Sequence, residues 1–161
     1  MLESSGSSSA SEYKEWLMPS MKYIIDYGII GVLVLMSILA VAVYIERLRT
    51  FRKIVPADYK TVQAYEAVLT KRMYIVATVG SNAPYVGLLG TVLGIMHTFY
   101  AIGAKGTTDV NMIMTGLALS LKATAAGLVT AIPAIILYNI LNRRANELIL
   151  LKEAENEGET V

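Results

Sequence analysis

The sequence contains no cysteine and only one histidine among its 161 residues. Without thiols there can be no disulfide framework and no thiolate metal site, and a single histidine argues against a zinc cage built from this chain alone. We therefore expect no metal site and no cofactor.

Charge is also scarce and nearly balanced. Charged residues make up 17% of the chain and hydrophobic residues 55%, and 14 basic side chains face 13 acidic ones. A nucleic-acid-binding protein needs a marked basic excess, and an ordinary soluble domain carries more charge than this. The composition predicts a small integral membrane protein whose surroundings are lipid and protein, with no nucleic-acid partner.

Arrangements typical of covalent catalysis are missing as well. The sequence has no nucleophile beside a base and no cluster with metal-ligand spacing, and its glycine-rich GLLGTVLG run has no lysine and no preceding strand. We expect a protein that is not an enzyme and has no catalytic residues.

Three apolar segments are long enough to cross a membrane, at 28–45, 74–102 and 112–141. Basic residues gather at one end of each segment, which by the positive-inside rule marks the cytoplasmic side. The N-terminus is then periplasmic and the C-terminus cytoplasmic. The predicted cytoplasmic basic anchors are Arg47, Arg49, Arg52, Lys53, Lys71, Arg72, Arg143 and Arg144.

The remaining stretches connect these spans. Residues 1–15 are Ser-rich and predicted to be disordered, and 16–27 suits an interfacial helix. Residues 46–73 form a small cytoplasmic helical region, and 103–111 a periplasmic turn. Residues 142–161 should continue the last helix into the cytoplasm and end in an acidic tail.

Small or helix-perturbing residues follow a 4-3-4-3-4 spacing in the second and third segments. One stripe is Gly80, Pro84, Gly87, Thr91, Gly94 and Thr98, and the other is Gly116, Ser120, Ala123, Gly127, Thr130 and Ala134. A narrow stripe without bulk lets helices approach closely in a membrane. The predicted packing residues are Gly80, Gly87, Gly90, Gly94, Gly116, Ala123 and Gly127, and the predicted helix kinks are at Pro84 and Pro133.

Polar groups at membrane depth are the candidates for function. Lys122 lies ten residues into the third segment, and its ammonium either snorkels to the headgroups or faces a wet cavity and a partner's carboxylate. Thr91 and Thr124 either bond the carbonyl four residues back or face an aqueous path. His97 is interpreted as an interfacial histidine.

Two stretches carry a family resemblance, GSNAPYVGLLGTVLGIMHTF and GLALSLKATAAGLVTAIPAIILYN. They strongly resemble the ExbB/TolQ/MotA superfamily of proton-driven motor proteins, in particular its ExbB branch. The resemblance implies an all-α inner-membrane protein with three transmembrane helices that extend into the cytoplasm, assembled as a homopentamer around a central pore. It also implies an ExbD-like single-span partner, which supplies a membrane aspartate, and a TonB-like partner.

The same resemblance assigns a pore and proton path. Thr91 matches the threonine of the family's GTV motif, and Thr124 that of its ATA motif. Leu119 stands where family members often carry a glutamate, and Lys122 follows one turn later. The departure implies that the essential acid belongs to the partner helix, whose aspartate the Lys122 ammonium would pair with or tune.

Three functions remain open at this point. The first is a proton-channel or motor subunit that uses the proton motive force to energise TonB-dependent uptake across the outer membrane. The second is a TolQ-like subunit that drives envelope constriction. The third, from a different class, is a structural membrane scaffold without an ion path.

Overall fold

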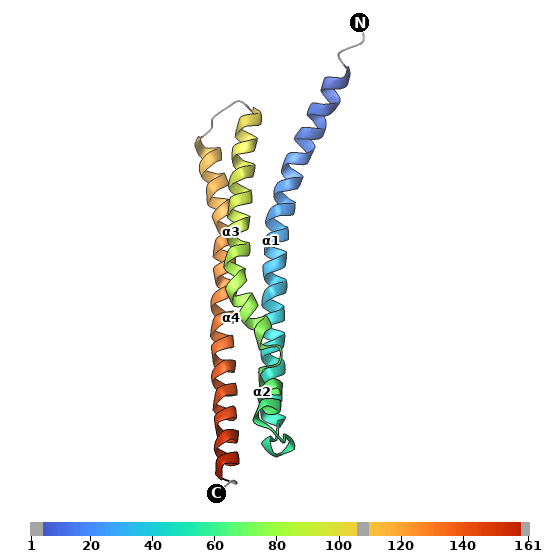
Figure 1. The fold of residues 1–161 in the computed structure, drawn as a ribbon. Coiled ribbons are helices and arrows are strands. Elements are labelled where there is room, and N and C mark those ends of the chain that lie inside the picture. The colour runs from blue at the N-terminus through green and yellow to red at the C-terminus, as the bar shows by residue number, and fades with distance from the viewer. Residues whose placement is uncertain (1–4, 106–109, 159–161) are drawn as a thin grey trace. The chain divides into compact units, whose positions relative to one another are not determined.

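The computed structural model describes the backbone of residues 5–105 and 110–158, and the side chains of 27–104 and 110–158. In chain order the described elements are α1 (Ser5–Lys53), the 3-10 helix η1 (Pro56–Asp58), α2 (Val62–Thr70), α3 (Met73–Lys105) and α4 (Val110–Gly158) (Figure 1). The described part of the chain is thus all-helical.

Three helical segments are long and apolar enough to cross a membrane: Tyr27–Lys53, Met73–Ala104 and Val110–Gly158. They leave large apolar side chains exposed, including Ile38 at 60% and Val129 at 72% of full exposure. Because soluble monomers rarely expose continuous apolar faces, these surfaces require lipid or other protein around them. The predicted fold class is confirmed to this extent: helices only, with three candidate spans.

One compact unit comprises residues 1–33 and 85–127. Within it α3 and α4 lie side by side and run antiparallel, with small residues at their contact (Figure 1). The pairs that set this register are Gly87 with Gly127, Gly94 with Ser120, and Gly116 with Thr98.

A second compact unit comprises residues 34–84 and 128–161. Its core combines α2 with parts of the three long helices. Helix α2 contributes Tyr65 and Leu69, which lie one helical turn apart on the same face and are both buried. The buried core residues are Ala40, Val43, Tyr65, Leu69, Met73, Val76, Val79, Ala134, Leu141 and Ala145.

Local sequence explains where the helices of this unit end. Pro56 cannot continue α1, and Val55 before it is extended, as proline requires of its predecessor. Thr61 caps α2 by accepting a hydrogen bond from the Ala64 amide at 3.3 Å. The turn from α2 to α3 places Arg72 in the left-handed region, with φ 61°.

Helix boundaries differ from those drawn on the sequence. Helix α1 is continuous from Ser5 to Lys53 and so covers segments that the sequence analysis treated as separate. Helix α4 likewise runs without a break from Val110 to Gly158. A helix that continues beyond its apolar span has its unpaired terminal N–H and C=O groups away from that span. Residues 106–109 of the predicted outer turn and the side chains of 16–26 lie outside the described parts.

Candidate functional site

Thr91 of α3 and Thr124 of α4 meet at the contact between these helices, where their hydroxyl groups are hydrogen-bonded to each other. The Thr91 hydroxyl also lies 3.3 Å from the carbonyl oxygen of Gly87 and 3.3 Å from that of Ser120. The Thr124 hydroxyl lies 3.3 Å from the same Gly87 carbonyl. Two hydroxyls and two carbonyls from both helices therefore form one polar cluster.

The cluster offers more acceptors than donors. Each threonine has one hydroxyl proton, while the two carbonyls and the two hydroxyl oxygens can all accept. More than one pattern of donors therefore satisfies the same geometry. A pair of hydroxyls with exchangeable hydrogen bonds can hold a water molecule or donate to a carboxylate without rearranging the backbone.

Close approach of the two helices makes this contact possible. A Cβ atom built on Gly87 would lie 2.7 Å from the Ala123 carbonyl oxygen and 3.1 Å from the Thr124 Cα. A Cβ on Gly90 would lie 2.6 Å from the Ala123 Cβ. Only glycine fits at these two positions, so the two glycines that precede Thr91 let its hydroxyl reach α4.

The flanking hydroxyls have the simpler role. Ser120 donates to the Gly116 carbonyl at 2.8 Å, and Thr98 to the Gly94 carbonyl at 2.9 Å. Each is a bond within its own helix to the residue four positions back, which satisfies the hydroxyl locally. Thr91 makes the same bond to Gly87 but adds contacts across to α4, and that addition distinguishes the site.

Lys122 and Leu119 lie elsewhere on α4. Both side chains are exposed, and the Lys122 ammonium forms no ion pair with any residue that the structure describes. Successive helical residues are rotated by about 100°, so Lys122 lies about 160° around the axis from Thr124. The structure brings Thr91 and Thr124 together but does not add Lys122 or Leu119 to their cluster.

The predicted basic anchors have different surroundings. Arg47 is 4% exposed and donates to the Val68 carbonyl at 3.0 Å and to Glu46 at 3.0 Å. Glu46 also accepts from Arg72 at 3.1 Å, so one carboxylate ties α1 to the turn before α3. Arg143 pairs with Glu147 at 3.0 Å on the surface of α4. Exposed side chains belong to Arg49, Arg52, Lys53, Lys71 and Arg144.

Other predicted positions are placed as follows. Pro84 and Pro133 lie inside the continuous helices α3 and α4. A Cβ built on Gly80 would lie 2.7 Å from the Ile135 side chain, within the second compact unit. No group of three or more histidine or acidic side chains that could hold a metal occurs among the described residues.

Sequence reasoning missed two members of the cluster. Ser120 was noted only as a small residue, but its carbonyl oxygen accepts from Thr91. The Gly87 carbonyl, which contacts both threonines, carries no side-chain signal at all. Pairing the two small-residue stripes in antiparallel order places Ser120 opposite Gly94, close to Thr91, but does not indicate that its carbonyl accepts a hydrogen bond.

Comparison with known proteins gives a consistent result. The model of the MotA/TolQ/ExbB proton channel family matches residues 34–154. The chain is 56% identical to the biopolymer transport protein ExbB of Aquifex aeolicus, over 86% of this chain and 93% of that protein. It is 51% identical to a putative biopolymer transport protein ExbB-like 2 of Helicobacter pylori, over 80% and 86%.

A more distant relative is the Tol-Pal system protein TolQ of Haemophilus influenzae, 47% identical over 48% of this chain and 34% of that protein. The ExbB relatives are transport proteins and not enzymes, in agreement with the lack of a catalytic arrangement in the sequence. Since the family model covers most of the chain and the Aquifex relative matches nearly from end to end, the chain belongs to the MotA/TolQ/ExbB proton channel family.

Proposed function

We propose that this chain is the ExbB-type proton-channel and motor subunit of a bacterial inner-membrane complex. With an ExbD-like partner it uses the proton motive force to energise TonB-dependent uptake across the outer membrane. The observation that carries the proposal is the hydroxyl pair of Thr91 and Thr124, held between two candidate spans in a chain of this family.

The proton carrier must come from another chain. The three predicted spans, 28–45, 74–102 and 112–141, contain no aspartate and no glutamate. Hydroxyl groups do not titrate near neutral pH, but they can receive a hydrogen bond from a protonated carboxyl or donate to its ionised form. We assign the carboxyl to an aspartate on a single membrane helix of the ExbD-like partner, next to the two threonines.

The assembly that suits this chemistry is a homopentamer around a central pore, with the partner helices inside it. The positive-inside rule places the N-terminus in the periplasm and the C-terminus in the cytoplasm. Exposed apolar side chains on the candidate spans, such as Val129 and Ile132, leave ample surface for contact between subunits and with lipid.

A match over nearly the whole length favours the ExbB branch over TolQ. The chain is 56% identical to the Aquifex ExbB over 93% of that protein, whereas its match to the Haemophilus TolQ covers 34% of that protein. The ExbB of Salmonella typhimurium is also covered only to 28%, so the end-to-end match to the Aquifex ExbB carries this preference. Growth on iron chelates as sole iron source, compared with detergent sensitivity, separates these two functions in a deletion strain.

Reconstitution tests the proposal against a structural scaffold. The chain and its ExbD-like partner are purified together and placed in proteoliposomes, and proton flux is followed with a pH-sensitive dye under an imposed potential. Thr124→Val keeps the side-chain volume and removes the hydroxyl, and we expect it to lower flux about tenfold, the value of one hydrogen bond of about 1.4 kcal/mol. Thr124→Ser should retain most of the flux.

Thr98→Val is the matched control. Its hydroxyl donates to the Gly94 carbonyl of its own helix, so its loss should leave flux near the wild-type value. Equal flux from the wild type and both valine variants, with native masses unchanged, would leave a scaffold as the better description.

A further inference from the structure

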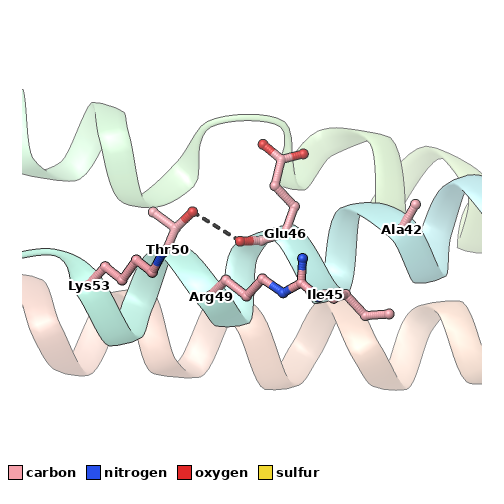
Figure 2. Close-up of a pocket in the computed structure, with 6 residues that line it drawn as sticks. All are labelled: Ala42, Ile45, Glu46, Arg49, Thr50 and Lys53. Atoms are coloured by element: carbon pink, nitrogen blue, oxygen red, sulfur yellow. Dashed lines mark hydrogen bonds between the residues drawn. The ribbon is translucent and has the colours of Figure 1, made fainter.

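A shallow groove of about 370 Å³ lies along one face of α1, where its apolar run ends. Six residues of this helix line it: Ala42, Ile45, Glu46, Arg49, Thr50 and Lys53 (Figure 2). Their spacing of three and four residues places them on the same side of α1.

The chemistry of the groove changes along the helix. Ala42 and Ile45 belong to the end of the apolar span, and both are exposed. Arg49 and Lys53 follow in the next two turns and are exposed as well. The Arg49 side chain extends along the helix on the side of Ile45 (Figure 2). An apolar wall therefore continues directly into two cationic groups.

The acid of the groove does not neutralise these cations. The Glu46 carboxylate is engaged by Arg72 at 3.1 Å and by Arg47 at 3.0 Å. The Thr50 hydroxyl donates to the Glu46 carbonyl at 3.0 Å (Figure 2). Arg49 and Lys53 form no ion pair with any other residue in the described part of the chain. Two positive charges thus remain for an outside partner.

We propose that this groove binds an anionic phospholipid, with the headgroup phosphate on Arg49 and Lys53 and an acyl chain along Ala42 and Ile45. Basic side chains just beyond a membrane span attract anionic lipids, and a guanidinium matches the geometry of phosphate oxygens. The proposal needs only that this helix crosses the membrane, and it is independent of proton transport.

Lipid retention tests it directly. The full chain with its partner is purified from nanodiscs that contain equal phosphatidylglycerol and phosphatidylcholine, and native mass spectrometry counts the lipids retained. The wild type should retain phosphatidylglycerol preferentially. The double variant Arg49→Gln with Lys53→Gln should lose this preference by about tenfold or more, since each basic group near a membrane surface contributes measurably to anionic lipid binding.

Arg52→Gln with Lys71→Gln is the matched control. Both residues are exposed and basic and belong to the same unit, but neither lines the groove. This variant removes the same charge and should retain phosphatidylglycerol as the wild type does. Equal loss in the two double variants would mean that surface charge attracts the lipid without a groove, and would overturn the proposal.

A second measurement does not depend on any variant. Photoactivatable phosphatidylglycerol in wild-type nanodiscs should crosslink to the peptide that spans residues 42–53. Crosslinks confined to other helices would contradict the assignment. So would displacement of the lipid by inorganic phosphate, which would make this a site for the free ion, or disulfide dimers of Ile45→Cys, which would make it a contact between copies.

Discussion

The Thr91 hydroxyl of α3 is hydrogen-bonded to the Thr124 hydroxyl of α4, so two residues 33 positions apart in the chain share one polar cluster. Their energetic coupling is testable with a double-mutant cycle of Thr91→Val and Thr124→Val. We expect a coupling free energy of about 0.5–1.5 kcal/mol, as for hydrogen bonds between membrane helices.

Reversible unfolding in mixed micelles measures each variant of this cycle. A parallel cycle with Thr98→Val and Thr124→Val serves as the reference, because the Thr98 hydroxyl bonds the Gly94 carbonyl on its own helix. These two changes should be additive. A coupling no larger for Thr91 than for Thr98 would contradict the assigned hydroxyl pair.

Glycine at position 87 sets the distance between the two helices. We expect Gly87→Ala to destabilise the protein by about 1–3 kcal/mol, because the added Cβ would lie 2.7 Å from a backbone oxygen, which cannot move aside as a side chain could. Gly103→Ala on the same helix is the control, since its Cβ would meet nothing within 4 Å. Alanine there should be neutral or stabilising, because it favours helix.

Thermal unfolding of the purified variants checks this prediction. Equal effects of the two substitutions would mean that no close contact excludes a Cβ at position 87, and would contradict the prediction. Flux through the reconstituted complex should also fall in Gly87→Ala, because separating the helices moves Thr91 away from Thr124.

Much of the contact between α3 and α4 could be predicted from the sequence. The apolar runs predict the three candidate spans, and the two stripes of small residues predict close packing. If the stripes are paired in antiparallel order, Gly94 meets Ser120 and Thr98 meets Gly116, both of which are contacts in the structure. The shared cluster was still not foreseen, because the Gly87 and Ser120 carbonyls have no signature in sequence.

The surroundings of the basic residues, in contrast, could not be predicted from the sequence. Their clustering is visible in the sequence, but the surroundings of each depend on how the chain folds back after Pro56. Arg47 is buried because α2 brings the Val68 carbonyl to its guanidinium, whereas Arg49 two positions later remains exposed. Helical periodicity separates these two faces, yet it does not say which face α2 covers.

The buried phenol of Tyr65 predicts that the stability of the fold depends on pH in the alkaline range. Its ring is fully buried, and its hydroxyl has no hydrogen-bond partner in the described part of the chain. Burial raises the pKa of the Tyr65 phenol above its usual value of 10.0, and the nearby Tyr59 adds to the shift. A phenol whose pKa is higher in the folded state stabilises the fold at lower pH, and that contribution is lost as pH rises through the folded-state pKa.

Tyr65→Phe should therefore be as stable as the wild type near neutral pH or slightly more so, since no hydrogen bond is lost. Above about pH 10 the wild type should lose stability more steeply than the variant. Unfolding curves recorded from pH 8 to 11 measure the difference, and Tyr74→Phe, at a side chain 69% exposed, is the control. Identical slopes for the wild type and Tyr65→Phe would mean that the pKa of Tyr65 is the same in the folded and unfolded states, and would contradict the prediction.

Lys122 gives the sharpest test of the proton path. An ammonium near the centre of a membrane helix costs about 2.5–3.5 kcal/mol, and no described residue of this chain forms an ion pair with it. Lys122→Met should therefore stabilise the isolated chain. If the ammonium pairs with the partner's aspartate, the same substitution should impair proton-dependent uptake while the native mass of the complex stays unchanged.

Gain of stability together with loss of activity separates pairing from snorkelling. A snorkelling lysine contributes its charge at the headgroups, so its replacement would leave uptake intact. Lys122→Arg keeps the charge and should retain part of the activity. Leu119→Met, about 60° away on the same exposed face, is the control for altered packing and should retain uptake. Full uptake in Lys122→Met would remove Lys122 from the proton path and leave the two threonines as this chain's contribution to it.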